Sequence, residues 1–425
     1  MPDLSADSTQ TLTISRLGQR GDGISHGATG TLFVPFTLPG ETVSVLVHDD
    51  RGWLESIIAA SPERKVPECP LFMRCGGCVA QHMGESIYAS WKQQNLADTF
   101  ERTGLSVSLS SMVAAHGEGR RRATFHARMV GSELATRDVE VGFMAARSHE
   151  IIPVDACPVL SPGMRDAPRL ARALAGLFRA AGKPLDIQIT ASEAGFDVDI
   201  RGHGPAGDKL RMILGEAARR LDLARLSLHG DIIVERRPPQ QHMGKAMVTP
   251  GPGSFLQATA LGEESIAQLV RAAMPKAKRV ADLFAGCGPF ALRLAEAAEV
   301  HAVESDGAAM LALDRAFRNT QGLRRVTTET RDLFRRPLLE PELNAFDAVV
   351  LDPPRAGAEA QVRWLAASKV PVIAYVSCDP ASFARDAKVL VEGGYALESV
   401  APVDQFRYSA HIELVGIFRK GKQKK

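Results

Sequence analysis

The sequence predicts an α/β protein in three parts: a small all-β unit over residues 1–66, an α+β domain over 67–250 and a Rossmann-like domain over 251–425. Residues 8–60 alternate apolar and polar side chains between Gly, Pro and Asp breaks, which is typical of short strands. Residues 105–250 mix strand-like and helix-like runs. In the last part, short apolar runs alternate with helical patterns, and this predicts a parallel, doubly wound sheet.

Composition argues against a mainly disordered or membrane-spanning chain. The 425 residues are 45% hydrophobic, 24% charged and 6% aromatic, as in globular domains. No apolar run reaches the ~18 residues that cross a bilayer, and the first residues do not resemble a signal peptide. We therefore expect a cytoplasmic protein with no membrane partner, and a monomer. The net charge of +2 neither requires nor excludes a nucleic-acid partner.

Two local patterns refine this organisation. Residues 61–67 form a polar linker, and residues 84–104 carry apolar side chains at helical spacing. Near the C-terminus, residues 395–406 and 411–420 are strand-like with no helix between them. They predict a terminal antiparallel hairpin on the parallel sheet.

A glycine turn follows the first strand of that sheet. The strand is expected to end at Phe284, and a helix is expected to open near Pro289. Gly286 and Gly288 lie between them, so that backbone amides point at a ligand. Glu304 ends the next strand, where its carboxylate can bind ribose hydroxyls. This spacing fits an NAD site, a structural turn or an S-adenosylmethionine site, and the terminal hairpin favours the last.

Three reactive side chains follow or lie on later strands. Asp352 and Cys378 each come directly after a buried strand, where open α/β sheets bind ligands. Glu413 lies between apolar neighbours on the last strand. The plainer interpretations are a turn-forming aspartate, an inert thiol and an exposed position of an alternating strand. Cys287, inside the glycine turn, is expected only to fill space.

A thiolate and a carboxylate at one sheet edge suit methylation of uracil carbon 5, which is a poor nucleophile. Addition of a thiolate to carbon 6 makes carbon 5 reactive toward a sulfonium methyl group, and a base then removes the carbon-5 proton. Cys378 would be the nucleophile and Glu413 the base.

Cysteines 69, 75 and 78 form a Cys-x5-Cys-x2-Cys cluster, and Cys157 supplies a fourth thiol. Four thiolates hold either zinc or an iron-sulfur cluster. From the spacing alone, zinc, iron-sulfur and no metal all remain open.

The combined motifs resemble those of the RNA 5-methyluridine methyltransferase family. The matching segments are FLQ at 255–257, DLFAGCGPF at 282–290, VES at 303–305, DPPRAG at 352–357, VSCDPASFARD at 376–386, DQF at 404–406 and HIE at 411–413. The resemblance implies a class I methyltransferase domain with Cys378 as nucleophile and Glu413 as proton acceptor. It also implies S-adenosylmethionine contacts from Gln257, Phe284, Glu304, Asp332 and Asp352. Pro289 departs from the family, which often has Asn there.

The resemblance also assigns roles outside the catalytic domain. The N-terminal unit is similar to a TRAM domain, an OB-like β barrel that binds RNA, and the four cysteines resemble ligands of a 4Fe-4S cluster. Both features favour 23S rRNA as the substrate. The alternatives are a tRNA T-loop enzyme, a catalytically silent RNA-binding assembly factor and a dehydrogenase.

An arginine run, Arg120, Arg121 and Arg122, precedes a strand-like segment of the central domain. It is expected to contact RNA phosphates, and the alternative is a solvated charged edge.

Overall fold

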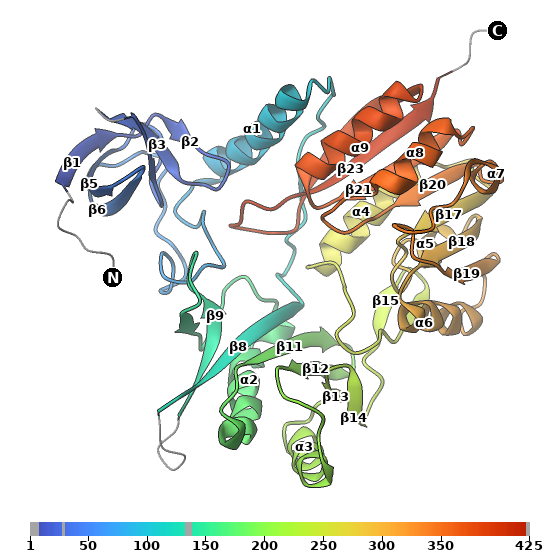
Figure 1. Ribbon diagram of the computed structural model, residues 1–425, viewed down its shortest axis with the longest axis horizontal. Helices are drawn as coiled ribbons and strands as arrows, with labels where there is room; N and C mark the ends of the chain where they lie inside the picture. Colours follow the sequence, from blue (N-terminus) through green and yellow to red (C-terminus); the bar gives the residue numbers. More distant parts are fainter. Residues whose placement is uncertain (1–7, 28–29, 132–137, 422–425) are drawn as a thin grey trace. The chain divides into compact units, whose positions relative to one another are not determined.

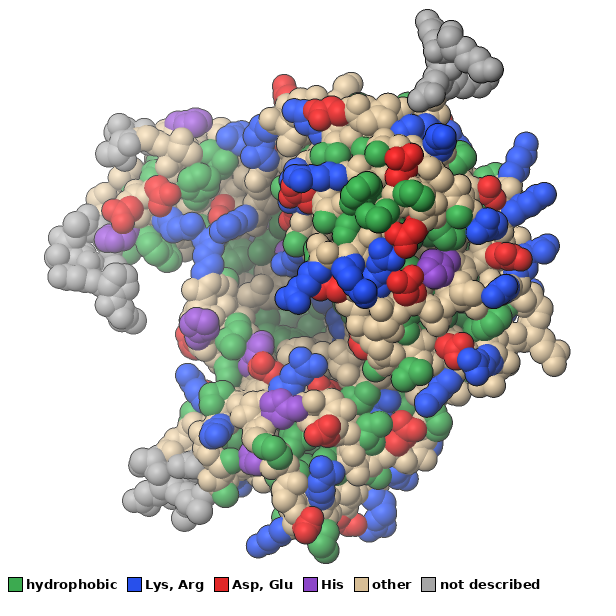
Figure 2. Space-filling model, turned by 45° about the vertical axis from the view of Figure 1, so that its right-hand side comes forward, with side chains coloured by type: hydrophobic (Ala, Val, Ile, Leu, Met, Phe, Trp, Pro, Cys, Tyr) green, Lys and Arg blue, Asp and Glu red, His purple; other side chains and the backbone are tan. Residues whose placement is uncertain are grey.

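The structure, a computed structural model, describes residues 8–27, 30–131 and 138–421. The chain divides into two compact units. Unit 1 comprises Met1–Thr99, Met144–Ile152 and Phe406–His411, and unit 2 comprises Phe100–Phe143, Pro153–Gln405 and Ile412–Lys425. No helix within the described ranges is long and apolar enough to cross a membrane. On the face seen in Figure 2, basic and acidic side chains are interspersed, in keeping with the small net charge.

Unit 1 contains a six-stranded sheet in the order β1-β5-β6-β4-β3-β2. Alternate residues of β5 are buried, so its valines form one side of a small apolar core. The predicted strand content of residues 8–60 is confirmed. The strands are β1 (Ser8–Thr13), β2 (Arg16–Leu17), β3 (Gly23–Gly27), β4 (Gly30–Val34), β5 (Thr42–His48) and β6 (Arg51–Ala59).

The predicted helix over residues 84–104 is confirmed as α1 (Glu85–Thr103). Within unit 1, Trp91 Nε1 donates a hydrogen bond to the Gly18 carbonyl at 2.8 Å. The buried Lys92 Nζ donates to the carbonyls of Phe406 (3.4 Å) and His411 (2.8 Å). The two bonds from Lys92 tie α1 to the loop that joins the last two strands of the chain.

The first part of unit 2 is an α+β arrangement, as predicted. Strands β9, β8, β11, β12, β13 and β14 are neighbours in that order, with the core formed between this sheet, α2 and α3. The elements are β8 (Arg122–Val130), β9 (Asp138–Met144), η1 (Pro162–Met164), α2 (Ala167–Ala175), η2 (Gly176–Ala181), β11 (Leu185–Ser192), β12 (Gly195–Arg201), α3 (Asp208–Arg220), β13 (Arg225–Leu228) and β14 (Asp231–Glu235). The short strand β10 (Ile151–Pro153) belongs to unit 1 except for Pro153. A two-stranded ribbon, β15 (Gln241–Met243) and β16 (Ala246–Val248), follows.

The second part of unit 2 is an eight-stranded sheet in the order β19-β18-β17-β20-β21-β23-β22-β7. Strands β17 to β21 pair in parallel, whereas β23 pairs antiparallel with both β21 and β22. The predicted doubly wound sheet and terminal hairpin are therefore confirmed. The strands are β7 (Val113–Ala114), β17 (Arg279–Leu283), β18 (Glu299–Glu304), β19 (Val326–Thr330), β20 (Ala348–Leu351), β21 (Val372–Ser377), β22 (Tyr395–Asp404) and β23 (Glu413–Lys420).

Helices cover both faces of this sheet (Figure 1). Apolar side chains of α4 (Ala260–Ala273), α5 (Ala291–Leu294) and α6 (Gly307–Arg318) share one core with alternate strand residues. On the other face, Phe383 of α9 (Pro380–Glu392) packs on Tyr375 and Phe418. Beside α9 lies α8 (Glu359–Ala367), which also contacts α7 (Glu340–Leu343).

Side-chain caps start the helices that follow the site loops. Thr259 accepts a hydrogen bond from the Gly262 amide, Asp306 from the amides of Ala308 and Ala309, and Asp379 from the Ser382 amide. The sequence prediction differs in one detail: the first strand ends at Leu283 rather than Phe284, because Phe284 adopts a left-handed conformation with φ +62°.

Candidate active site

The predicted site residues of the catalytic domain lie along one edge of the sheet. Phe284, Asp352 and Cys378 each directly follow a parallel strand, and Glu304 ends another. Glu413 begins β23, which runs in the opposite direction, so that it lies at the same edge. The carboxyl edge of a parallel sheet is where open α/β folds bind ligands.

The glycine turn leaves open space beside its backbone. Gly286 has φ +53°, and a Cβ built on it would meet no atom within 4 Å. Gly288 has φ +94°, and a Cβ there would lie 2.6 Å from Leu313 Cδ1. Gly288 is therefore required by packing, whereas Gly286 borders volume that a ligand can fill. The Pro289 carbonyl accepts a hydrogen bond from Arg293 Nη1 at 2.8 Å, which supports the turn from within the fold.

Glu304 is held at the end of β18 by backbone donors. Its Oε2 accepts from the Gly286 amide at 3.2 Å, and its Oε1 accepts from the amides of Ser305 (2.6 Å) and Asp306 (3.0 Å). Asp332 is similarly held, since its Oδ1 accepts from the Phe334 amide at 2.9 Å. Glu304, fixed beside the open glycine turn, fits the polar part of a nucleoside such as that of S-adenosylmethionine.

Two amides link the carboxyl groups of Asp352 and Glu413. Gln257 Nε2 donates to Asp352 Oδ2 at 3.4 Å, and Gln405 Nε2 donates to Gln257 Oε1 at 2.6 Å. Gln405 Nε2 also donates to Glu413 Oε1 at 3.2 Å. The Thr259 amide donates to Gln405 Oε1 at 3.4 Å, which orients the Gln405 side chain. Gln257, Gln405 and Glu413 are all at least 97% buried.

Burial raises the pKa values of both carboxyl groups. Burial, with a smaller effect of Asp352, raises the pKa of Glu413 to about 8, against the opposing effects of the Gln405 hydrogen bond and Arg355. Burial and the nearby Glu304 raise the pKa of Asp352 to about 7. Such pKa values near neutrality are typical of groups that accept and release protons during a reaction.

Cys378 shares the electrostatic environment of these carboxyl groups. Burial raises the pKa of its thiol to about 11, and Glu413 and Asp352 add to the rise while Arg355 opposes it. In the absence of substrate the thiol is therefore protonated near pH 7. Cys287, in contrast, is buried in an apolar cluster and its pKa is raised by burial to about 12, which agrees with its predicted role as a space-filling residue.

Three further residues at this site were not singled out from the sequence. Gln405 and Arg355 lie within recognised motifs, but their roles depend on contacts made across the fold. Asp282, inside β17, is fully buried, and neither carboxylate oxygen has a hydrogen-bond partner among the described residues. Burial raises the pKa of Asp282 well above its usual range, with a further contribution from Asp352. A carboxyl in the middle of an apolar strand was the sequence signal for it.

The arginine run is partly built into unit 2. Arg121 Nη2 pairs with the buried Glu263 Oε2 at 2.5 Å, and its Nε donates to the Gln257 carbonyl at 3.2 Å. Arg122 Nη1 donates to the Ser254 carbonyl at 3.0 Å, and its guanidinium lies 5.2 Å from the Phe255 ring centroid. A solvated edge is thus the wrong description of Arg121, whose ion pair supports the backbone of Gln257.

All six cysteines are in the described part of the chain, and none forms a disulfide there. Cys69, Cys75 and Cys78 belong to unit 1, and Cys157 belongs to unit 2. Burial raises the pKa of Cys75, and Cys69 lies near enough to raise it further. Four thiols are a suitable donor set for an iron-sulfur cluster. However, the described residues include no group of three or more His, Cys, Asp or Glu side chains arranged to hold a metal ion.

Comparisons with known proteins identify the family of this chain. Residues 224–422 match the family model described as tRNA (uracil-5-)-methyltransferase. An RNA methyltransferase of Brucella suis biovar 1 is 44% identical over 420 residues, which cover 99% of this chain and 100% of that protein. The 23S rRNA (uracil(1939)-C(5))-methyltransferase RlmD of Chromohalobacter salexigens is 34% identical, with 95% of this chain and 87% of that protein covered.

A solved structure shows the same fold. The tRNA (uracil-54, C5)-methyltransferase of Pyrococcus abyssi, in complex with S-adenosyl-L-homocysteine, aligns with a TM-score of 0.71 at 21% identity. The alignment covers 96% of this chain and 99% of that one. Together with the identity to the RNA methyltransferases, these findings lead to one conclusion. The chain belongs to the S-adenosylmethionine-dependent RNA uracil-C5 methyltransferase family.

Proposed function

We propose that this protein transfers a methyl group from S-adenosylmethionine to carbon 5 of a uridine in 23S rRNA, through a covalent bond between Cys378 and uracil carbon 6. The observation that carries the proposal is the hydrogen-bonded series Asp352, Gln257, Gln405 and Glu413 beside the Cys378 thiol. It supports the proposal because the side chains proposed as nucleophile, base and cofactor-side carboxyl all lie at one sheet edge.

The proposed steps use these residues in turn. The Cys378 thiol first releases its proton to solvent, and the resulting thiolate adds to carbon 6, with the displaced electron pair moving onto the uracil as an enolate. S-adenosylmethionine, when bound, supplies an electrophilic methyl group, which carbon 5 of the uracil takes up as the sulfonium bond to that methyl breaks. Glu413 then removes the carbon-5 proton, the double bond between carbons 5 and 6 re-forms, and the Cys378 sulfur leaves as thiolate.

The remaining residues would hold the cofactor in reach. Gln257 and Asp352 border the base and thiol, and Glu304 and Asp332 lie at the ends of neighbouring strands. The open side of Gly286 fits a bound ligand, because no atom lies within 4 Å of a Cβ built there. We propose these residues, with Phe284, Gly288 and Pro289, as the S-adenosylmethionine site.

The choice of 23S rRNA is supported by the identity of 34% to RlmD over 95% of the chain. A tRNA substrate is the second candidate, favoured by the description of the matching family model and the fold shared with the Pyrococcus abyssi enzyme. The deciding experiment is mass-spectrometric mapping of 5-methyluridine in rRNA and tRNA from cells with and without the gene, followed by addition of purified protein to unmodified RNA. Loss and restoration of a 23S rRNA site would support the proposal, and loss in tRNA alone would overturn its substrate.

We also propose roles for the domains of the chain and for residues outside the catalytic site. Residues 1–66 act as a TRAM-like RNA-binding barrel, residues 67–250 as a central domain and residues 251–425 as the catalytic domain of a monomer. Cys69, Cys75, Cys78 and Cys157 hold a 4Fe-4S cluster, supported by their spacing and thiol chemistry, and the reaction above uses no electron transfer. Arg120, Arg121 and Arg122 remain proposed RNA contacts, although Arg121 already pairs with Glu263.

A further inference from the structure

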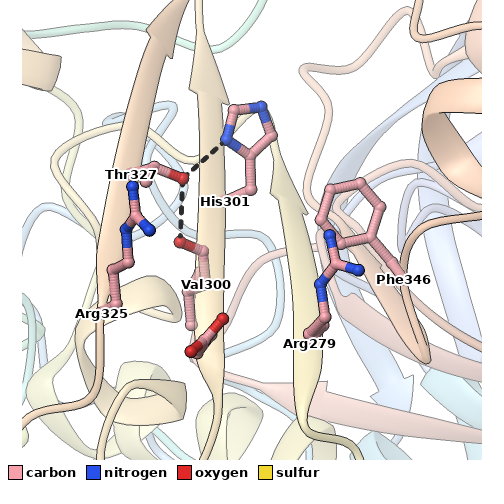
Figure 3. Close-up of a pocket in the computed structure, with 7 residues that line it drawn as sticks. Arg279, Val300, His301, Arg325, Thr327 and Phe346 are labelled. Atoms are coloured by element: carbon pink, nitrogen blue, oxygen red, sulfur yellow. Dashed lines mark hydrogen bonds between the residues drawn. The ribbon is translucent and has the colours of Figure 1, made fainter.

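A second pocket lies at the opposite edge of the catalytic sheet (Figure 3). Its volume is about 170 Å³. Arg279 begins β17, His301 and Glu299 come from β18, Arg325 precedes β19, and Phe346 precedes β20. These are the amino-terminal ends of the parallel strands, so the pocket is separated from Cys378 and Glu413 by the length of the strands, ~13–20 Å at 3.3 Å per residue.

Two arginines in this pocket form no ion pair with the residues that the structure describes. Within the described ranges, the Arg325 guanidinium makes no hydrogen bond or ion pair, and the Arg279 guanidinium contacts only the Phe346 ring, 5.8 Å from its centroid. In Figure 3 the two side chains rise from strands on either side of His301. Unpaired guanidinium groups facing one cavity are suited to a phosphate group.

A flat aromatic surface adjoins the arginines. The rings of His301 and Phe346 lie within 8° of parallel, with centroids 5.9 Å apart. The His301 ring is held by Thr327 Oγ1, 2.9 Å from Nδ1, and by Glu329 Oε2, 3.3 Å from Nε2. Thr327 Oγ1 also donates to the Val300 carbonyl at 3.4 Å, so that its hydroxyl links the His301 ring to the backbone of β18. A ring fixed in this way can stack with a base at little cost in entropy.

Glu299 adds an acceptor to the same pocket. No ion pair or hydrogen bond of its carboxylate is formed with the residues that the structure describes. An unpaired carboxylate beside two arginines would disfavour a simple anion, but it can accept hydrogen bonds from the exocyclic amine of a base. The set of groups thus matches a nucleotide better than a free phosphate ion.

We infer that this pocket binds one unpaired nucleotide, with its phosphate on Arg279 and Arg325 and its base against Phe346 and His301. The nucleotide comes either from the RNA substrate, outside the uridine at the catalytic edge, or from a free mononucleotide. The RNA source rests on the proposed function, whereas the chemistry of the pocket does not.

The test is direct binding, without S-adenosylmethionine or turnover. Calorimetry with AMP, GMP and inorganic phosphate, and anisotropy with a single-stranded RNA over a range of salt, are measured for the wild type and for Arg279→Gln/Arg325→Gln. The matched control is Arg219→Gln/Arg363→Gln, which removes the same charge from exposed positions on α3 and α8. Phe346→Leu removes the ring without changing the charge.

We expect the wild type to bind nucleotides, Arg279→Gln/Arg325→Gln to bind them about tenfold more weakly, and the control variant to bind them as the wild type does. For Arg279→Gln/Arg325→Gln, the magnitude of the salt slope of RNA binding should fall by ~0.7 for each lost phosphate contact. Phe346→Leu should weaken nucleotides but not inorganic phosphate. If the double variant bound nucleotides more weakly but kept the RNA affinity of the wild type, the pocket would be supported with a free mononucleotide as its ligand. Equal binding of phosphate and nucleotides, or no binding, would overturn the inference. Failure of the proposed methylation would instead appear as absence of 5-methyluridine, with nucleotide binding intact.

Discussion

Gln405 donates a hydrogen bond from Nε2 to Oε1 of Glu413 over 3.2 Å. The same nitrogen donates to Gln257 Oε1 at 2.6 Å, and Gln257 in turn reaches Asp352. The side chain that orients the proposed base is therefore also bonded to the side chain on the cofactor side. Gln405 therefore connects the two sides of the site by direct hydrogen bonds.

Replacing Gln405 by Leu should impair proton removal by Glu413. Loss of the donated hydrogen bond raises the pKa of Glu413, because that bond favours the carboxylate. A hydrogen bond to a charged group contributes ~1.5–3 kcal/mol, so we expect turnover at pH 7 to fall about tenfold or more. The measurement is the pH profile of kcat for methylation of an RNA oligonucleotide.

The matched control for Gln405→Leu is Gln268→Leu, since Gln268 is an exposed glutamine of α4 whose Nε2 donates to Glu264 Oε1. If Gln405→Leu and Gln268→Leu both lowered kcat and neither shifted the pH profile, the role of Gln405 would be structural, with no effect on the pKa of Glu413.

The pH profile of the wild-type protein should rise toward about pH 8. Burial raises the pKa of Glu413 to about 8 from the usual 4.5, and a base acts in its deprotonated form. As the pH rises through that pKa, the fraction of carboxylate grows and kcat increases. A flat profile between pH 6 and 9 in single-turnover experiments would contradict this assignment.

Substitution of Glu413 by Gln should trap the covalent complex. The glutamine keeps a hydrogen-bonding side chain but cannot take the carbon-5 proton, so release of the Cys378 sulfur is blocked. We expect a protein–RNA adduct that survives denaturing electrophoresis, and at least a hundredfold loss of turnover. Glu398→Gln, at an exposed position of β22, is the control and should form no stable adduct.

Cys378→Ala should abolish methylation and leave cofactor binding intact. The substitution removes the attacking sulfur, whereas Gln257, Glu304 and Asp332 remain in place. Calorimetry with S-adenosyl-L-homocysteine should give an affinity within about twofold of the wild type. Measurable turnover in the alanine variant would exclude Cys378 as the nucleophile.

An iron-sulfur cluster should be visible in anaerobically purified protein. We expect brown protein with about four irons per chain, and loss of iron and colour in Cys75→Ala/Cys78→Ala. Cys378→Ala serves as the control, because it lies outside the cysteine cluster and should retain the iron. Stoichiometric zinc in colourless protein would show that the four thiols bind a different metal.

Much of the catalytic domain was predictable because it depends on local patterns. The alternation of short apolar runs and helical segments predicted the parallel sheet, and the missing helix before residues 411–420 predicted the hairpin. Since parallel strands share their carboxyl edge, the residues after each strand were expected to meet there. The sequence thus predicted Asp352 and Cys378 at that edge, and it assigned Glu413 of the last strand to the same reaction.

Other contacts could not be predicted, because they join residues far apart in the chain. Arg121 looked like one of three RNA-binding arginines, yet it pairs with Glu263, 142 residues away. Gln405 donates to Gln257 across 148 residues. The pocket at the far edge is formed by residues at or near the starts of four strands, and no sequence motif marks those positions.

The sequence by itself determined the alternation of strands and helices, the reactive side chains and the family, because hydrophobic periodicity and motif spacing are properties of neighbouring residues. Only the tertiary structure decided the protonation and orientation of those side chains. Burial raises the pKa values of Cys378, Asp352 and Glu413, and burial exists only once the sheet and its helices have packed. The same packing brings Gln257 and Gln405 between the two carboxyl groups, where their amides hold the site in one arrangement.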